Sequence, residues 1–300
     1  KLKAAIVANP EIFVDLDESM PLTLLDQKHA GKKLLLITNS EWPYTRFMMS
    51  YACDRFLPDS MTWRDLFDLV VVSARKPDFF SYQASAYQVV NEEQGHLVPH
   101  NVEMQVGEVY VGGNAALIER SLSCSGGDIL YVGDHIFGDV TMSKSTLRWR
   151  TALILRELEE ELTCVAECAE LHEQIQDAMV QKEALEAELS ALRLDIQRKQ
   201  IGYATTSKET LEQVKSREQC LREEITKLDE QITPLLVEDA KQVNPYWGYL
   251  MRAGNDKSHL TRQIERHADI YTSRVSNFLY YTPFMYFRSP RGSMPHDMPK

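Results

Sequence analysis

The sequence predicts an α/β fold, in which a doubly wound, Rossmann-like parallel sheet carries an inserted helical hairpin. Four short runs of Leu and β-branched residues, at residues 34–38, 69–73, 129–132 and 151–155, alternate with helical stretches and end in polar turns. Short, uniformly apolar runs are typical of parallel strands that helices cover on both faces. Residues 157–238, by contrast, hold one Gly and one Pro and repeat apolar residues at helical spacing.

Composition and charge are those of a globular protein with a buried core. Of the 300 residues, 44% are hydrophobic and 26% are charged. No apolar run comes near the ~20 residues that cross a bilayer, and a net charge of −11 disfavours a broad nucleic-acid-binding surface. The five cysteines form no CxxC pair, which is typical of a reduced protein. We therefore expect a cytoplasmic protein that uses neither nucleic acid nor a membrane as a partner.

Charge and apolar periodicity divide the chain into three predicted parts. Residues 1–156 carry the strand runs and form the core. Residues 157–238 hold 20 acidic and 9 basic residues, and two apolar stripes broken at residues 201–207 predict an acidic, coiled-coil-like helical hairpin. Residues 239–300 are rich in aromatic side chains and predict a C-terminal helix and tail that pack on the core. The alternatives are a partner-binding coiled coil in the middle part and a membrane or partner surface in the last.

Chemistry in a parallel α/β sheet gathers at the carboxyl ends of the strands. The first run ends at Thr38 and is followed by Asn39 and Ser40. These residues offer a hydroxyl and backbone N–H groups at a helix start, where an anionic oxygen is stabilised. The second run is followed by Lys76, a point charge suited to a phosphoryl group or to a nucleophilic carboxylate. Taken singly, these residues also fit a helix N-cap and a surface lysine.

The third run leads into the motif GDHIFGD, residues 133–139, which is the most specific signal in the sequence. It places Asp134 and Asp139 five residues apart, next to glycines, at a strand end. Two carboxylates held close together favour a counter-cation, and Mg²⁺ takes oxygen ligands and keeps waters for a substrate phosphate. The motif therefore predicts a Mg²⁺ site, with His135 in a packing or supporting position. The alternative is a turn aspartate followed by a helix N-cap.

A strand-end hydroxyl, a lysine and a paired-aspartate motif, in this order, resemble the haloacid-dehalogenase-like phosphohydrolases. More closely, the chain resembles the cytosolic purine 5′-nucleotidase family, which includes IMP/GMP-specific enzymes and 5′-nucleotidase domain-containing proteins. The resemblance covers nearly the whole chain and is loose only over residues 157–238. The segments that carry it are TNSEWPYTRFMMSY (38–51), FDLVVVSARKPDFF (67–80), DILYVGDHIFGDV (128–140), RWRTALILREL (148–158) and RQIERHADIYTSRVSNFLYYTPFMYFR (262–288).

This resemblance implies Mg²⁺-dependent hydrolysis of a purine nucleoside 5′-monophosphate, IMP or GMP, through an aspartyl-phosphate intermediate. Thr38, Asn39 and Ser40 would hold the phosphoryl group. Lys76 would bind it as well and would also neutralise the charge of the nucleophile. Asp134 would ligate Mg²⁺. Lys76 and Asp139 would be the two catalytic residues, and Asp139 would orient Lys76 or the water shell of the metal. The family also implies a homodimer or homotetramer.

The chain departs from the family at the DxDxT-like motif, which supplies the attacking aspartate and the acid–base aspartate. Residues 15–19 read DLDES, but a very short apolar run precedes them, and only residues 20–33 separate them from the next strand. In the family, a similar acidic stretch precedes that strand and the nucleophile lies far upstream. The chain also opens at Lys1 in the middle of a pattern, so we expect the core to lack its first motif and the chain alone to be inactive. An upstream organelle-targeting segment is left open.

Two other functions remain as alternatives to a purine nucleotidase. One is a non-catalytic family member that acts as a scaffold through the helices of residues 157–238. The other is a phosphatase for a different small phosphomonoester. Asp15 stays as the alternative nucleophile within the chain.

Overall fold

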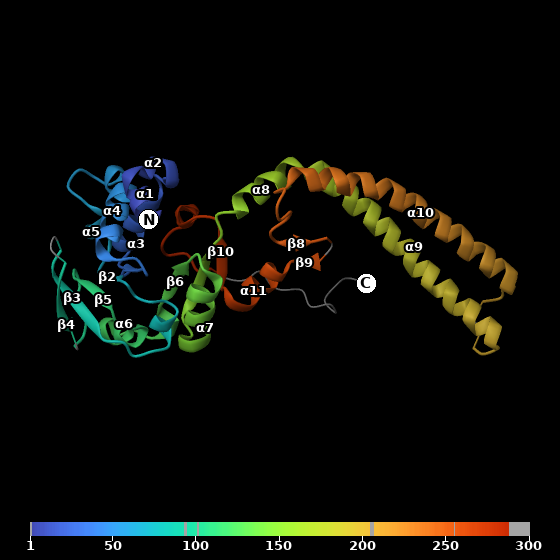
Figure 1. Cartoon of the computed structure of the whole chain (residues 1–300). Coiled ribbons are helices and arrows are strands. Elements are labelled where there is room, and N and C mark those ends of the chain that lie inside the picture. The colour runs from blue at the N-terminus through green and yellow to red at the C-terminus, as the bar shows by residue number, and fades with distance from the viewer. Residues whose placement is uncertain (1, 93–94, 101, 205–206, 255, 288–300) are drawn as a thin grey trace. The chain divides into compact units, whose positions relative to one another are not determined.

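The computed structural model describes residues 2–92, 95–100, 102–204, 207–254 and 256–287 (Figure 1). The chain divides into two compact units, residues 1–156 with 262–300 and residues 157–261. The first unit carries the two larger sheets, and the second carries the long helices. Over the described ranges, every helix is too short or too polar to cross a membrane.

The larger sheet has five strands. Their order is β1-β2-β5-β3-β4, that is Leu35–Ile37, Leu69–Val72, Val109–Gly112, Ala86–Asn91 and His96–His100. Strands β1, β2 and β5 run parallel, whereas β3 pairs antiparallel with both β5 and β4. Every residue of β2 is buried, as expected for an inner parallel strand, and β4 is exposed along most of its length. The α/β class with a parallel-rich sheet, predicted from the sequence, is confirmed.

A second sheet in the same unit has the order β10-β7-β6, with all strands parallel: Ile270–Thr272, Arg150–Ile154 and Leu130–Gly133. Within the described residues, β6 pairs with β7 alone and β1 with β2 alone, so each is the last strand of its sheet. Leu130 and Val132 of β6 are 46% and 38% exposed, although β6 belongs to a parallel sheet. The strands thus form two sheets, and a single doubly wound sheet remains a prediction.

Helices and short turns flank the strands of the first unit. The helices are α1 (Leu2–Ala8), α2 (Pro10–Phe13), α3 (Met20–His29), α4 (Trp42–Cys53), α5 (Trp63–Leu66), α6 (Ala115–Leu122) and α7 (Met142–Leu147), with α11 (His259–His267) beginning in the second unit and ending in the first. Local chemistry fixes several of their starts. Pro43 occupies the first turn of α4, where the missing N–H costs nothing, and the Asn114 side chain accepts the Leu117 N–H to cap α6.

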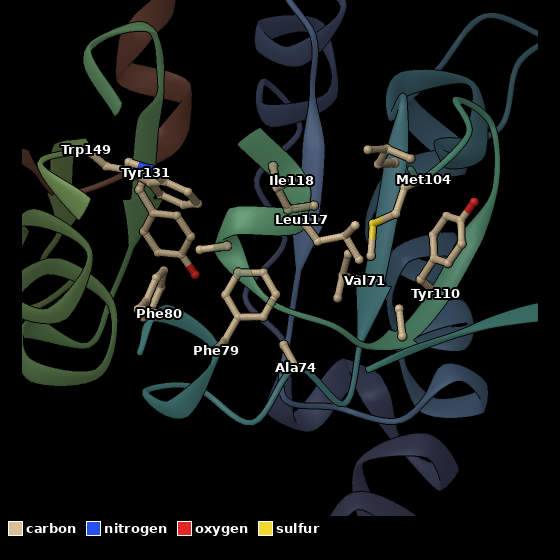
Figure 2. Close-up of a cluster of buried hydrophobic side chains, with 13 residues drawn as sticks. Val71, Ala74, Phe79, Phe80, Met104, Tyr110, Leu117, Ile118, Tyr131 and Trp149 are labelled. Atoms are coloured by element: carbon tan, nitrogen blue, oxygen red, sulfur yellow. The ribbon is translucent and has the colours of Figure 1, made fainter. Parts of the chain in front are cut away.

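An aromatic cluster connects the two sheets (Figure 2). The Phe80 ring, in the turn after β2, lies 5.2 Å from the ring of Tyr131 in β6 and 5.8 Å from the ring of Trp149, just before β7, all three nearly or fully buried. Phe79 packs beside them on the β2 side, where Val71 lies deeper in the same core (Figure 2). Because these contacts are edge-to-face aromatic pairs, they add to the burial energy and fix the ends of β2 and β6 near each other.

The second unit is dominated by two long helices, α9 (Ala169–Ile201) and α10 (Leu211–Gln242), which follow α8 (Leu158–Glu167). Ion pairs Lys182–Asp229 at 2.5 Å and Arg193–Glu218 at 3.3 Å show that α9 and α10 are antiparallel. Their interface is apolar and contains Leu189, Leu192, Val214 and Leu221, with Leu185, Ile196 and Ile225 at its edge. A two-stranded ribbon, β8 (Arg252–Ala253) and β9 (Asp256–Lys257), follows.

Candidate active site

The ends of β1 and β2 are joined by backbone and side-chain hydrogen bonds. The Ala74 N–H donates to the Thr38 carbonyl at 3.0 Å, and the Ser40 N–H donates to the Thr38 hydroxyl at 3.1 Å. The Asn39 side chain accepts the Lys76 N–H at 2.6 Å and donates to the Lys76 carbonyl at 3.0 Å. Asn39 therefore pins the backbone of Lys76 to the end of β1.

The turn that carries Lys76 has a strained backbone. Ser73 and Arg75, neither of them glycine, have φ values of +48° and +61°. Left-handed conformations cost such residues of order 1 kcal/mol each and persist only where surrounding structure enforces them, often at functional sites. Here the Ser73 N–H donates to the Ser40 carbonyl at 2.8 Å, which holds the turn against the start of α4.

The Lys76 ammonium group reaches across to the other sheet. It lies 2.8 Å from the Asp139 carboxylate, in an ion pair whose side chains are 16% and 4% exposed. It also lies 5.6 Å from the centroid of the Tyr131 ring, within reach of a cation–π contact. Because both charged groups are largely removed from water, each is stabilised by the opposite charge of the other. The pair links the end of β2 to the end of β6.

Asp139 owes its position to a π-helical turn, Ile136–Thr141, that directly follows β6. Its carboxylate accepts the His135 N–H at 3.2 Å and the Tyr131 hydroxyl at 3.3 Å. A Cβ atom on Gly133 would lie 2.6 Å from the Asp139 Cβ, so only glycine allows this approach. Burial raises the pKa of Tyr131, and the Asp139 carboxylate raises it further, so the phenol stays protonated as a donor.

Asp134 lies at the end of β6 and is exposed. His135 next to it uses its ring Nδ1 to accept the Gly138 N–H at 2.8 Å, which is a structural contact. Over the described residues, no three His, Cys, Asp or Glu side chains gather into a group that could hold a metal ion. A Mg²⁺ ion needs only one or two protein carboxylates when waters and a phosphate complete its shell, so the Asp134 carboxylate fits such an ion as a single protein ligand.

The acidic stretch DLDES is engaged elsewhere. Asp15 forms ion pairs with Arg156 at 2.7 Å and with Arg274 at 3.4 Å. Arg156 lies two residues after the end of β7, and Arg274 lies two residues after the end of β10. The hydrogen bond from Arg156 and the charges of both arginines hold the pKa of Asp15 below its ordinary value. Asp17 accepts a hydrogen bond from the Ser276 hydroxyl at 2.6 Å. These contacts tie residues 15–17 to the ends of β7 and β10.

The structure therefore gathers the ends of β1, β2 and β6, with Thr38, Asn39, Ser40, Lys76 and Asp139 joined through the contacts above. Tyr131 was not predicted as part of this group. Its signal in the sequence is a single tyrosine within an otherwise aliphatic strand run, two residues before the GDHIFGD motif.

The ends of these strands bring together backbone N–H donors, a hydroxyl and a buried lysine–aspartate pair, which are groups of the kind that suit an anionic ligand. The family model that matches residues 1–299 is that of the 5′ nucleotidase family, and the chain belongs to this family. A 5′-nucleotidase domain-containing protein from Dictyostelium discoideum is 28% identical over 301 residues, which cover 97% of this chain and 45% of the relative. The chain thus spans less than half the length of this curated relative.

Proposed function

We propose that this chain forms part of a Mg²⁺-dependent phosphohydrolase that converts a purine nucleoside 5′-monophosphate, IMP or GMP, to nucleoside and phosphate. The observation that carries the proposal is the buried Lys76–Asp139 pair, which lies where the ends of β1, β2 and β6 meet. Membership in the 5′ nucleotidase family supplies the reaction class. The choice of purine follows from the sequence resemblance alone.

Each residue of the site has a role in this proposal. The Thr38 hydroxyl and the N–H groups at the start of α4 would bind the phosphoryl oxygens. The Lys76 ammonium group would neutralise charge as an aspartate carboxylate attacks phosphorus, while the bond from phosphorus to the 5′ oxygen breaks. That oxygen would leave with a proton from a second carboxyl group, and water would then hydrolyse the aspartyl-phosphate to free phosphate. Asp139 would keep Lys76 aimed at the phosphoryl group.

Asp134 would hold the Mg²⁺ ion. The ion, when bound, would neutralise phosphate charge as a Lewis acid. Asp139 is less suited to this task, because Lys76, Tyr131 and the His135 N–H already occupy its carboxylate.

We further propose that the attacking aspartate comes from outside the 300 residues. Asp15 and Asp17 are tied to the ends of β7 and β10. The outer edges of β1 and β6 lack a neighbouring strand within the described part of the chain, and Lys76 spans between the ends of their sheets. An added parallel strand that pairs with both edges would bring a carboxylate at its end towards Lys76.

The experiment is phosphate release from IMP, GMP, UMP and p-nitrophenyl phosphate with Mg²⁺. The 300-residue chain and its Asp15→Asn variant should both release little phosphate. A longer natural form that carries an upstream DxDxT-like motif should hydrolyse IMP or GMP, and Lys76→Met should lower its kcat by about 10³-fold, comparable with the loss of an oxyanion donor. An active 300-residue chain with a dead Asp15→Asn variant would make Asp15 the nucleophile. Hydrolysis of p-nitrophenyl phosphate without hydrolysis of any nucleotide would favour another phosphomonoester.

Assembly into a homodimer or homotetramer is also proposed, from the sequence resemblance. Light scattering of the purified protein tests it directly. A monomer over the whole accessible concentration range would contradict this part of the proposal without touching the reaction.

A further inference from the structure

The side chain of Asn39 is engaged at both ends by the backbone of one other residue. Asn39 lies two residues after the end of β1 and is exposed. Its Oδ1 atom accepts the Lys76 N–H at 2.6 Å, and its Nδ2 atom donates to the Lys76 carbonyl at 3.0 Å. A primary amide has one acceptor oxygen and one donor nitrogen, and both atoms are used here on the same residue. The amide is therefore directed at the backbone of Lys76.

Two contacts between backbone groups hold the first residues of the turn after β2. The Ser73 N–H donates to the Ser40 carbonyl at 2.8 Å, and the Ala74 N–H donates to the Thr38 carbonyl at 3.0 Å. Because both contacts use main-chain atoms, a substitution of a side chain leaves them in place. The amide of Asn39 supplies the later contact in the same turn, and it is the one of the three that depends on a side chain.

The ammonium group of Lys76 depends on where the backbone of this residue lies. It lies 2.8 Å from the Asp139 carboxylate and 5.6 Å from the centroid of the Tyr131 ring. A lysine carries its charge on a flexible stem, so the charged end is placed precisely only if the backbone is fixed. A displacement of about 1 Å in a catalytic geometry can cost about 10²-fold in rate. The two hydrogen bonds from Asn39 thus bear directly on the placement of the ammonium group.

We propose that Asn39 is a positioning residue, which acts on the phosphoryl group through Lys76 and does not bind that group with its own side chain. Its amide fixes the backbone from which the Lys76 side chain reaches towards Asp139. This role differs from the phosphate contact that the sequence resemblance implies for Asn39. The inference rests on the proposed function, because the phosphoryl group is taken as the target of Lys76. The link between Asn39 and Lys76 can be measured without catalysis.

The first test is acetylation of lysines by sulfo-N-hydroxysuccinimide acetate, followed by mass spectrometry of the purified 300-residue chain. Lys76 should react slowly, because its side chain is 16% exposed and its ammonium group is paired. Asn39→Ala should raise the rate at Lys76 about fivefold, since the two hydrogen bonds that fix its backbone are lost. Lys33, whose side chain is 59% exposed, is the internal reference, and its rate should not change.

The matched control for this labelling is Asn9→Ala. Asn9 is also exposed and precedes α2, but its side chain makes no capping hydrogen bond. This variant should label at Lys76 as the unsubstituted chain does. Equal rates at Lys76 in Asn39→Ala and Asn9→Ala would overturn the inference, whatever the catalytic activity of the protein.

The second test is a double-mutant cycle on kcat for IMP or GMP, in the longer natural form with Mg²⁺. Asn39→Ala should lower kcat by about 10²-fold, whereas the same substitution added to Lys76→Met should lower it no further. Two losses that multiply would mean that Asn39 acts on the phosphoryl group independently of Lys76, and would overturn the inference. Absence of hydrolysis by the longer form would contradict the proposed function, and the labelling rates would then decide alone whether Asn39 positions Lys76.

Discussion

Replacing Gly133 by alanine should damage the candidate active site without adding or removing any polar group. In the present structure, a Cβ atom at this position would lie 2.6 Å from the Asp139 Cβ and 2.7 Å from its Oδ2. Ordinary contacts between such atoms are longer by about 0.8 Å or more, so Asp139 must move. Its room to move is small, because its own N–H donates to the His135 carbonyl at 2.8 Å and its carboxylate pairs with Lys76 at 2.8 Å.

The expected cost combines overpacking with the loss of a charge-assisted contact. Overpacking a buried site costs about 1–3 kcal/mol, and a hydrogen bond to a charged group contributes about 1.5–3 kcal/mol. The two overlap, because the displaced Asp139 relieves the clash as it leaves Lys76. We therefore expect the free energy of unfolding to fall by about 3 kcal/mol. For a unit of this size the corresponding drop in Tm is about 6–12 °C.

Urea unfolding followed by tryptophan fluorescence measures this change. Trp149 is a direct reporter, because its ring lies 5.9 Å from that of Tyr131, which donates to Asp139. Gly127→Ala is the matched control, since nothing lies within 4 Å of its added Cβ and it lacks a left-handed φ. If Gly133→Ala is as stable as Gly127→Ala, the close approach of Asp139 to β6 is wrong.

Three further changes probe other contacts. Lys76→Met leaves the Asp139 carboxylate buried without its cation, so urea unfolding should show a loss of about 3 kcal/mol that the double variant Lys76→Met/Asp139→Leu partly recovers. Burial alone would raise the pKa of Asp269, yet hydrogen bonds from Lys144 and a backbone N–H lower it overall. Its stabilisation is thus complete above the unfolded pKa of about 3.9 and is lost as pH falls through the lower folded pKa, so Asp269→Asn should flatten the Tm profile below about pH 4. A profile unchanged by the substitution would contradict that assignment. Leu192→Ala, in the hairpin interface, should cost about 2–4 kcal/mol in helix unfolding followed by circular dichroism at 222 nm, and no loss would mean that α9 and α10 do not pack there.

Four of the six parallel strands, β1, β2, β6 and β7, were predictable because their signal is local. Strand β2 lies within the predicted run at residues 69–73, and all its residues are buried, so an unbroken apolar run was required. Strands β3 and β4 gave no such signal, since they lie at the antiparallel edge and β4 has no fully buried residue. Strand β10 has three residues and none is fully buried. Edge and very short strands are selected by their neighbours rather than by their own sequence.

The candidate site shows the same division between local and distant information. The family resemblance implied that Asp139 orients Lys76 or the water shell of the metal, but the GDHIFGD motif by itself could not show which of its two aspartates faces Lys76. That choice depends on the π-helical turn and on the absent Cβ of Gly133, which act only in three dimensions. The contact of Asp15 with Arg156 and Arg274 joins residues 141 and 259 positions apart, a pairing that no spacing rule reveals. The roles of the site residues remain predictions.

The insertion of the helical hairpin into the first unit has a consequence for the order of folding. Strand β10 pairs with β7, and the Thr151 N–H reaches Asp269, 118 residues along the chain. Closing so long a loop from a disordered chain carries an entropic cost that grows with the logarithm of its length. Helices α9 and α10 are joined by one short connection, so their contacts are local and can form early. Once the hairpin has formed, the loop that must still close between β7 and β10 is much shorter. Destabilising the hairpin should therefore slow the docking of β10, even though no hairpin residue belongs to the sheet.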